Sequence, residues 1–277
     1  MVLQQEIEQL YDADPASMDR VKALKAFNEL LFFLDHGEIR AADRSAGEWR
    51  VNTWVKKGIL LGFRLGALED MSIHPRMHFF DKGTFPLKKL SVRDGVRVVP
   101  GGSSIREGAY VARGVVCMPP MYINVGAYVD EGAMIDSHAL VGSCAQVGKH
   151  VHVSAAAQLG GVLEPIGALP VIVEDDVFIG GGCGVYEGSI VKKGAVLAAG
   201  VILTGGTAVY DTVRKAIYRK SATAPLVIPE NAVVVPGSRP LDGDWAAEQR
   251  LSVSTPVIVK YRDAKTDASL VLESGLR

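Results

Sequence analysis

The sequence predicts a mainly β protein whose central part is a left-handed parallel β-helix of hexapeptide repeats, with an N-terminal helical domain and a short C-terminal β cap. Two observations predict it. Steps of six residues reach an apolar residue ten times in succession, at Ile105, Val111, Cys117, Ile123, Val129, Ile135, Val141, Val147, Val153 and Leu159. The residue four places after each of these anchors is small or β-branched in eight of the ten cases, as at Ala109, Val115 and Ala127. This period fits neither an α-helix nor simple strand alternation, and it favours a triangular coil of three hexads whose turns stack about 4.8 Å apart.

The same frame resumes after an interruption. Seven further anchors follow, at Val173, Ile179, Val185, Val191, Leu197, Leu203 and Val209. The interruption, GGVLEPIGALPVI, is rich in Gly and Pro, which predicts a loop inserted into the repeat at residues 160–172. The 17 anchors, ten plus seven, predict five to six coils. A sandwich of short strands is the alternative, but a sandwich would not keep a fixed six-residue frame across two blocks.

The flanking regions lack this period. Residues 17–36 place apolar side chains at three- and four-residue steps before Gly37 and therefore predict a helix, and residues 49–66 are a second, less regular candidate. We assign residues 1–95 to the mainly helical domain, 96–227 to the β-helix and 228–277 to the C-terminal cap. In the cap, IPENAVVVPGSRPL resembles a further coil turn, and the strand that follows would protect the open end of the prism from strand addition.

Charge and cysteine content exclude several classes of protein. The 30 Lys and Arg nearly balance the 31 Asp and Glu, for a net charge of −1, so no overall field favours nucleic acid or an anionic membrane as a partner. No apolar run approaches the roughly 18 residues of a membrane span, and the acidic start does not resemble a secretory signal. The three cysteines lack a CxxC pair, which indicates reduced thiols in a cytoplasmic protein, and their repeat positions predict buried packing residues rather than nucleophiles.

Polar residues that follow the anchors are the candidates for chemistry, because prisms of this kind usually assemble as trimers with ligand grooves between neighbours. Asp130 and Asp136 are six residues apart, and we expect them to stack on one face, where one carboxylate could act as a general base. The alternative is that such carboxylates are solvated or cap turns. His138, His150 and His152 could hold a catalytic zinc, but their spacing gives no obvious convergence, so we expect no metal site.

Several motifs together resemble a known family. They are the run from Tyr122 to Pro165 that contains YINVGAYVDEGAMIDSHALVGSCAQVGKHVHVS and GGVLEP, with WVKKGILLGFR at 54–64, FFDKG at 79–83, RVVP at 97–100 and VIVKYRDAKT at 257–266. On these residues the chain resembles the 2,3,4,5-tetrahydropyridine-2,6-dicarboxylate N-succinyltransferase family of lysine and diaminopimelate biosynthesis. The resemblance covers all three regions and is more specific than the hexapeptide period.

The resemblance implies a cytoplasmic homotrimer that moves succinyl from succinyl-CoA to the amine of the ring-opened dicarboxylate. It implies that Arg97 grips a substrate carboxylate and that Asp136 contacts substrate as the candidate general base. For CoA we expect main-chain contacts around Gly180, Gly181 and Gly182 and from Ala198 to Gly200, phosphate contacts from Lys260 or Lys265, and a cover over the pantetheine formed by the loop at 160–172.

The chain departs from the family at the site itself. Gly184 stands where much of the family has a second active-site glutamate, and Ser137 and His138 replace the more usual threonine and tryptophan. We therefore expect Glu187 or His138 to supplement Asp136, with Glu187 taken as the second catalytic residue. The alternatives are an acetyltransferase acting on the same acceptor, a zinc hydratase built on the same prism, and a non-catalytic ligand-binding prism.

Overall fold

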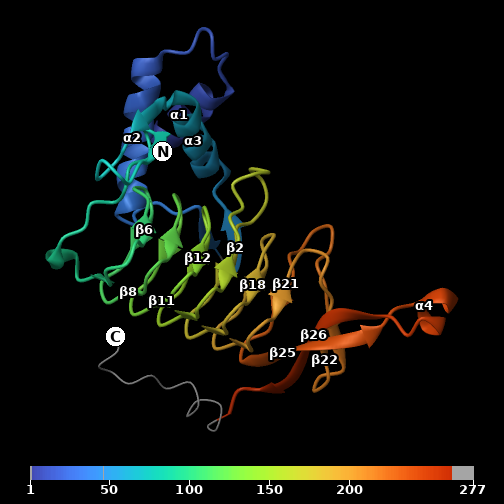
Figure 1. The fold of residues 1–277 in the computed structure, drawn as a ribbon. Coiled ribbons are helices and arrows are strands. Elements are labelled where there is room, and N and C mark those ends of the chain that lie inside the picture. The colour runs from blue at the N-terminus through green and yellow to red at the C-terminus, as the bar shows by residue number, and fades with distance from the viewer. Residues whose placement is uncertain (1, 46, 264–277) are drawn as a thin grey trace.

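A computed structural model describes residues 2–45 and 47–263, and its central feature is a three-walled prism of short parallel strands (Figure 1). The first wall consists of β5 (Arg97–Val98), β8 (Val116–Cys117), β11 (Met134–Ile135), β14 (His152–Val153), β17 (Phe178–Ile179), β20 (Val196–Leu197) and β25 (Ala232–Pro240). The second wall consists of β6 (Ser104–Ile105), β9 (Tyr122–Ile123), β12 (Leu140–Val141), β15 (Gln158–Leu159), β18 (Gly184–Val185) and β21 (Ile202–Leu203).

The third wall consists of β7 (Tyr110–Val111), β10 (Tyr128–Val129), β13 (Gln146–Val147), β16 (Ile172–Val173), β19 (Ile190–Val191) and β24 (Val227–Ile228). Within the described residues the chain visits the walls in this order six times, so the prediction of five to six coils is confirmed. The predicted β-helix is confirmed with them.

The anchors form the core because each is the second residue of its strand and points inward. Val129, Ile135 and Val141 are completely buried, and so are the small residues Ala133 and Ala145 that follow anchors by four places. A step of six residues moves the chain from one wall to the next, and a step of 18 returns it to the same wall one coil on, as in the pairing of Ile135 with Val153.

The last anchor, Val209, is buried in the prism core as predicted, but it does not continue the coil. Val209 lies in β22 (Val209–Asp211), which pairs with β23 (Ala216–Tyr218) and β26 (Ser252–Tyr261), and does not form a coil strand. The chain leaves the prism after Leu203, and β24 completes the sixth coil. The physical reason is that the place beside β19 on the third wall is taken by β24, whereas β22 forms its hydrogen bonds with β23 and β26.

Three helices and a hairpin cover one side of the prism. In the described part of the N-terminal region, α1 (Val2–Asp12), α2 (Arg20–Asp35) and α3 (Thr53–Leu65) pack together. Asp19 caps α2 by accepting from two backbone amides. The region predicted as a second helix begins as a strand, because β2 (Glu48–Val51) pairs with β1 (Ala42–Ser45) before α3 starts.

The helices bury their apolar faces on the corner between the second and third walls, which we call the helix-covered corner. Val125 and Cys144 of that corner belong to the same buried cluster as the helices. The hairpin β1–β2 lies on the third wall, where the Arg40 guanidinium stacks 3.7 Å from the Tyr128 ring centroid and donates to Gln146. The helices therefore do not cover the two corners on either side of the first wall.

The two ends of the prism are closed differently. A short hairpin of β3 (Leu68–Asp70) and β4 (Phe80–Lys82), followed by the 3-10 turn Val92–Asp94, leads into β5. At the other end β25 and β26 form a long antiparallel hairpin that projects from the prism with α4 (Asp244–Glu248) near its tip (Figure 1). No helix among the described residues is both long and apolar enough to cross a membrane.

Candidate functional site

Asp136 lies on the corner between the first and second walls, which we call the Asp136 corner. The registers of Ile135 with Val153, of Val153 with Ile179 and of Ile179 with Leu197 place the residues that follow these in one column, Asp136, Ser154, Gly180 and Ala198. Their backbone amides donate to carbonyls of the next coil at 2.8–3.0 Å. The column is therefore a rigid edge that runs along the prism.

The residues predicted to contact CoA lie on this edge. Gly180 and Ala198 stand in the column itself, and Gly181 and Gly200 belong to the turns that follow them. Gly182 has a φ of +65°, and a side chain there would meet nothing within 4 Å. These two turns carry no side chain larger than a methyl group, and Gly182, Ala199 and Gly200 are exposed, so an extended ligand can lie against their backbone. Gly180 itself is buried, and Ser154 lies between it and Asp136 in the column.

Arg97 lies on the first wall, close to the same edge. It pairs with Val116, which pairs with Met134, so Arg97 is two strands from the strand that leads to Asp136, or about 10 Å. The side chain is exposed. A small dicarboxylate held by the guanidinium can therefore extend along the wall toward the Asp136 carboxylate.

Lys260 lies farther along the same wall. Lys260 is on β26 and pairs with Val233 of β25. Its Nζ is 3.4 Å from Oδ1 of Asp263. The other predicted phosphate contact, Lys265, lies outside the described residues.

The predicted stacking of Asp130 on Asp136 is wrong. Asp130 follows β10 on the third wall and Asp136 follows β11 on the first wall of the next coil, so the two carboxylates occupy different corners of the prism. Residues stack only when 18 residues separate them within an uninterrupted block, as Asp136 and Ser154 do. No pair of carboxylates forms at this site from these two residues.

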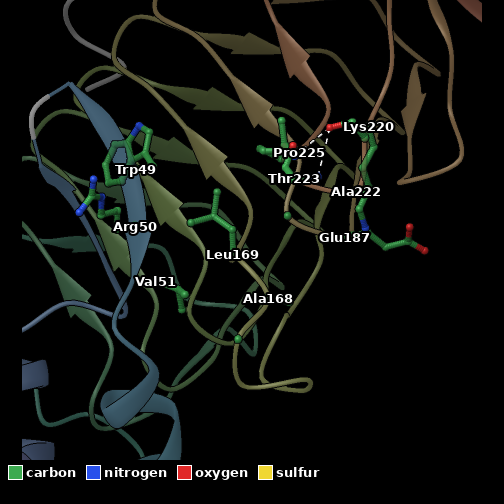
Figure 2. Close-up of a pocket in the computed structure, with 14 residues that line it drawn as sticks. Trp49, Arg50, Val51, Ala168, Leu169, Glu187, Lys220, Ala222, Thr223 and Pro225 are labelled. Carbon is green, nitrogen blue, oxygen red and sulfur yellow. Dashed lines mark hydrogen bonds between the residues drawn. The ribbon is translucent and has the colours of Figure 1, made fainter.

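Glu187 lies on the helix-covered corner, two coils beyond Asp136. It follows β18, and its Oε2 accepts from the backbone N–H of Gly205 at 2.6 Å. Figure 2 shows it at the rim of a pocket that Leu169 and Lys220 also line, with its carboxylate turned away from Leu169. Within one chain the structure does not bring Glu187 and Asp136 together, and the hydrogen bond to Gly205 gives Glu187 a structural task.

Two substitutions at Glu187 separate a structural from a catalytic role. Glu187→Gln keeps an oxygen that accepts from Gly205 but removes the charge, so we expect kcat close to the wild-type value. Glu187→Ala removes the acceptor and should lower the free energy of unfolding by about 1 kcal/mol or less, because the hydrogen bond is exposed to solvent. Chemical denaturation and steady-state kinetics on both variants check this, and a collapse of kcat in a stably folded Glu187→Gln protein would restore the catalytic assignment.

Gly184 lies on the second wall, and its environment accounts for the absence of a larger side chain. A Cβ built on Gly184 would overlap the ring of Tyr186, two residues on. The Tyr186 hydroxyl donates to Oε1 of Gln158 on the neighbouring strand at 2.9 Å. Tyr186 therefore takes the space that a glutamate at position 184 would need.

The cost of a side chain at position 184 should depend on Tyr186. We expect Gly184→Ala to push the ring aside and break its hydrogen bond to Gln158, at about 1 kcal/mol of stability. In a Tyr186→Ala background the same change should cost almost nothing. Unfolding free energies of the four proteins in this double-mutant cycle provide the measurement. Equal losses in both backgrounds would mean that the ring is not what excludes the side chain.

The inserted loop, residues 160–171 between β15 and β16, packs on the helix-covered corner. The buried Lys56 of α3 donates from Nζ to the Ala168 carbonyl at 2.5 Å, and the Val162 amide donates to Ser143 at 3.2 Å. Within one chain the loop therefore lies across the second wall from the Asp136 corner. It does not cover the edge formed by Gly180 and Ala198.

The histidines and cysteines take separate places. His138 is exposed on the Asp136 corner, His150 lies 3.3 Å from Asp176 on the corner between the third and first walls, and His152 lies on the first wall. Among residues 2–45 and 47–263 no group of three His, Cys, Asp or Glu side chains is placed to hold a metal ion. All three cysteines are buried, and burial raises the pKa of the Cys144 and Cys117 thiols to about 12, which opposes a nucleophilic role.

Sequence reasoning missed one contact at the site. Nε2 of His152 lies 3.9 Å from Oδ2 of Asp136. The signal was available, because His152 follows Met134 by 18 residues and so must lie beside it on the first wall.

The three-walled prism places the chain among the hexapeptide-repeat proteins, and comparisons with known proteins narrow this class to the succinyltransferases. Residues 170–205 match the family model described as the hexapeptide repeat of succinyl-transferase, and residues 2–65 match that of the tetrahydrodipicolinate N-succinyltransferase N-terminal region. A solved structure from Campylobacter jejuni, described as a 2,3,4,5-tetrahydropyridine-2-carboxylate N-succinyltransferase, aligns over 84% of this chain and 62% of its own with a TM-score of 0.50. At 16% identity it supports the fold alone.

Curated relatives decide the family. A protein of Psychrobacter sp. strain PRwf-1 named 2,3,4,5-tetrahydropyridine-2,6-dicarboxylate N-succinyltransferase is 42% identical to this chain. The alignment covers 100% of this chain and 99% of the relative. The protein of that name in Azoarcus sp. strain BH72 is 43% identical, over 91% of this chain and 89% of the relative. The chain belongs to the tetrahydrodipicolinate N-succinyltransferase family.

Proposed function

We propose that this chain transfers a succinyl group from succinyl-CoA to the amine of ring-opened tetrahydrodipicolinate, in lysine and diaminopimelate biosynthesis. The observation that carries the proposal is the edge at the Asp136 corner, where a partly exposed carboxylate lies in one column with Gly180 and Ala198, whose turns carry no side chain larger than a methyl group. An acyl-CoA bound along this edge brings its thioester to the carboxylate. The choice of succinyl as the acyl group and of tetrahydrodipicolinate as the acceptor rests on the full-length similarity to curated N-succinyltransferases.

The residues divide the work by their chemistry. Arg97 holds one acceptor carboxylate through a planar guanidinium fork. The acceptor amine attacks the thioester carbon and forms the new C–N bond, and the Asp136 carboxylate takes the amine proton. The tetrahedral intermediate then collapses with cleavage of the C–S bond, and CoA leaves as a thiolate that takes up a proton and becomes free CoA. The column amides already donate to the next coil. The amides of Ser137 and His138 in the Asp136 turn also donate within the chain, so none of these backbone groups is a ready donor for the tetrahedral oxyanion.

The test is a thiol-release assay with the cyclic dicarboxylate as acceptor. Succinyl-CoA should release free CoA only when the acceptor is present, and mass spectrometry should find the N-succinyl product. Acetyl-CoA serves as the competing donor, because an acetyltransferase on the same acceptor is the nearest alternative. Faster turnover with acetyl-CoA would replace the succinyl assignment, and release of CoA from neither donor would contradict acyl transfer.

We infer that the working form is a homotrimer. An exposed apolar surface supports this, formed by Ile73, Met77, Phe79, Phe80 and Leu87 beside the first coils. A contiguous exposed apolar surface usually marks a site of interaction with another protein. Light scattering of the purified chain gives the mass, and a monomer at enzyme-assay concentrations would contradict the inference. We place the protein in the cytoplasm, where its three unpaired cysteines would remain reduced.

A further inference from the structure

The imidazole of His152 lies behind the Asp136 carboxylate. His152 is on β14, directly beside Met134 of β11, and Asp136 follows that strand by one residue. Nε2 of the ring is 3.9 Å from Oδ2 of Asp136. On the other side the ring packs on Phe178, with ring centroids 5.0 Å apart. Strand pairing and this aromatic contact therefore set where the imidazole stands.

Exposure separates the tasks that the two side chains can perform. The Asp136 side chain is 30% exposed, the His152 side chain is 12% exposed, and both ring nitrogens of His152 are buried. A ligand on the Asp136 corner can therefore touch the carboxylate but not the ring nitrogens. If His152 affects the reaction, its ring nitrogens act on the ligand through the Asp136 carboxylate.

The two carboxylate oxygens have different neighbours. Oδ1 accepts from the backbone N–H of Ser137 at 2.7 Å, whereas Oδ2 faces His152. A carboxylate has about four lone-pair sites, so an oxygen that accepts from an imidazole N–H can still accept a proton from a ligand. Together the backbone of Ser137 and the ring of His152 can fix the plane of the carboxylate.

We propose that His152 is a positioning residue for Asp136. With the acceptor bound, Nε2–H donates to Oδ2 and holds the carboxylate so that its open lone pair meets the amine proton. The 3.9 Å separation is longer than a hydrogen bond. Such contacts at active sites are commonly long without ligand and shorten in the substrate complex. The inference rests on the proposed function, because it assigns the orientation of the base in that same reaction.

Kinetics of two variants test the orientation. His152→Phe keeps an aromatic ring beside Phe178 and removes the donor, and we expect kcat to fall about 100-fold with little change in the acceptor KM, because a misplaced base acts on the transition state. His152→Gln places an amide N–H near the position of Nε2 and should recover a large part of kcat. His150→Asn is the matched control, because it removes an exposed imidazole two residues away and should keep wild-type kinetics. A His152→Phe enzyme with wild-type kcat, or a Gln variant no better than Phe, would overturn the proposal.

A double variant asks whether His152 acts through Asp136. Once Asp136→Asn has removed the base, adding His152→Phe should lower kcat no further. If the two losses multiply instead, His152 has a separate role and the proposal fails.

A measurement without turnover keeps this inference distinct from the proposed function. In the full-length protein labelled with ¹⁵N-histidine, Asp136→Asn should change the ring ¹⁵N shifts of His152, which the His152→Gln spectrum assigns, and Asp130→Asn should leave them unchanged. Unchanged His152 shifts in Asp136→Asn would refute the contact whatever the enzyme catalyses. An inactive wild type with the expected shifts would instead refute only the succinyl transfer.

Discussion

Replacing Asp136 by asparagine is expected to lower kcat by roughly 10²- to 10⁴-fold, the range in which a positioned general base contributes to proton transfer. Asparagine has nearly the shape of aspartate, and its carbonyl oxygen can still accept from the Ser137 amide that Oδ1 now accepts from. The loss should therefore reflect the missing base and not a rearranged corner. Steady-state assays with succinyl-CoA and the cyclic dicarboxylate measure it.

The control for this prediction is Asp130→Asn. Asp130 is the equivalent corner residue one wall earlier, and its Oδ1 accepts from the next backbone amide at 2.8 Å, much as Asp136 does. It should keep wild-type kcat. Thermal unfolding and light scattering of both variants should match the wild type. Full activity in Asp136→Asn, or an equal loss in Asp130→Asn, would remove Asp136 from the role of base.

Arg97→Lys is expected to weaken acceptor binding about tenfold or more with kcat largely preserved. The lysine keeps the positive charge but cannot offer the planar pair of N–H donors that a carboxylate accepts from arginine, and hydrogen bonds to charged groups contribute about 1.5–3 kcal/mol. Because Arg97 is about two strand spacings from Asp136, it should hold the acceptor without touching the atoms that react. The acceptor KM, measured at saturating succinyl-CoA, reports the effect.

Arg113→Lys is the matched control for Arg97. Arg113 is also exposed near the first coil, but its guanidinium donates to the backbone carbonyl of Arg93. Its KM for the acceptor should equal that of the wild type. If Arg97→Lys leaves the acceptor KM unchanged, another cation holds the substrate carboxylate. If the succinyl-CoA KM rises instead, Arg97 serves the donor and not the acceptor.

The repeat could be predicted because each anchor meets the same local requirement. An inward residue such as Val129 or Ile135 has to be apolar, and the small residue four places later has to fit where the wall turns. These requirements recur every six residues and need no knowledge of distant contacts. The error at Val209 shows the limit, because the end of the frame depends on whether the next segment closes the coil or pairs with β26.

The site could be predicted in parts. The sequence points to Asp136 and the glycine-rich turns, but the six-residue spacing of Asp130 and Asp136 does not stack them, because a step of six advances the chain by one wall. Within an uninterrupted block the step of 18 would have placed His152 beside Met134. Across the inserted loop that count fails, because Val173 follows Leu159 by 14 residues where the frame allows six.

The sequence by itself determined the prism, its core and the identity of the residues on its corners, since a short period encodes them through local burial. Only the tertiary structure decided which corners align. It joined Asp136 to Gly180 and Ala198 on one edge, placed His152 behind the carboxylate, and separated Glu187 by binding it to Gly205 on the helix-covered corner. The physical reason is that columns form by hydrogen bonds between coils, and which residues face one another depends on how many residues a loop inserts into the frame.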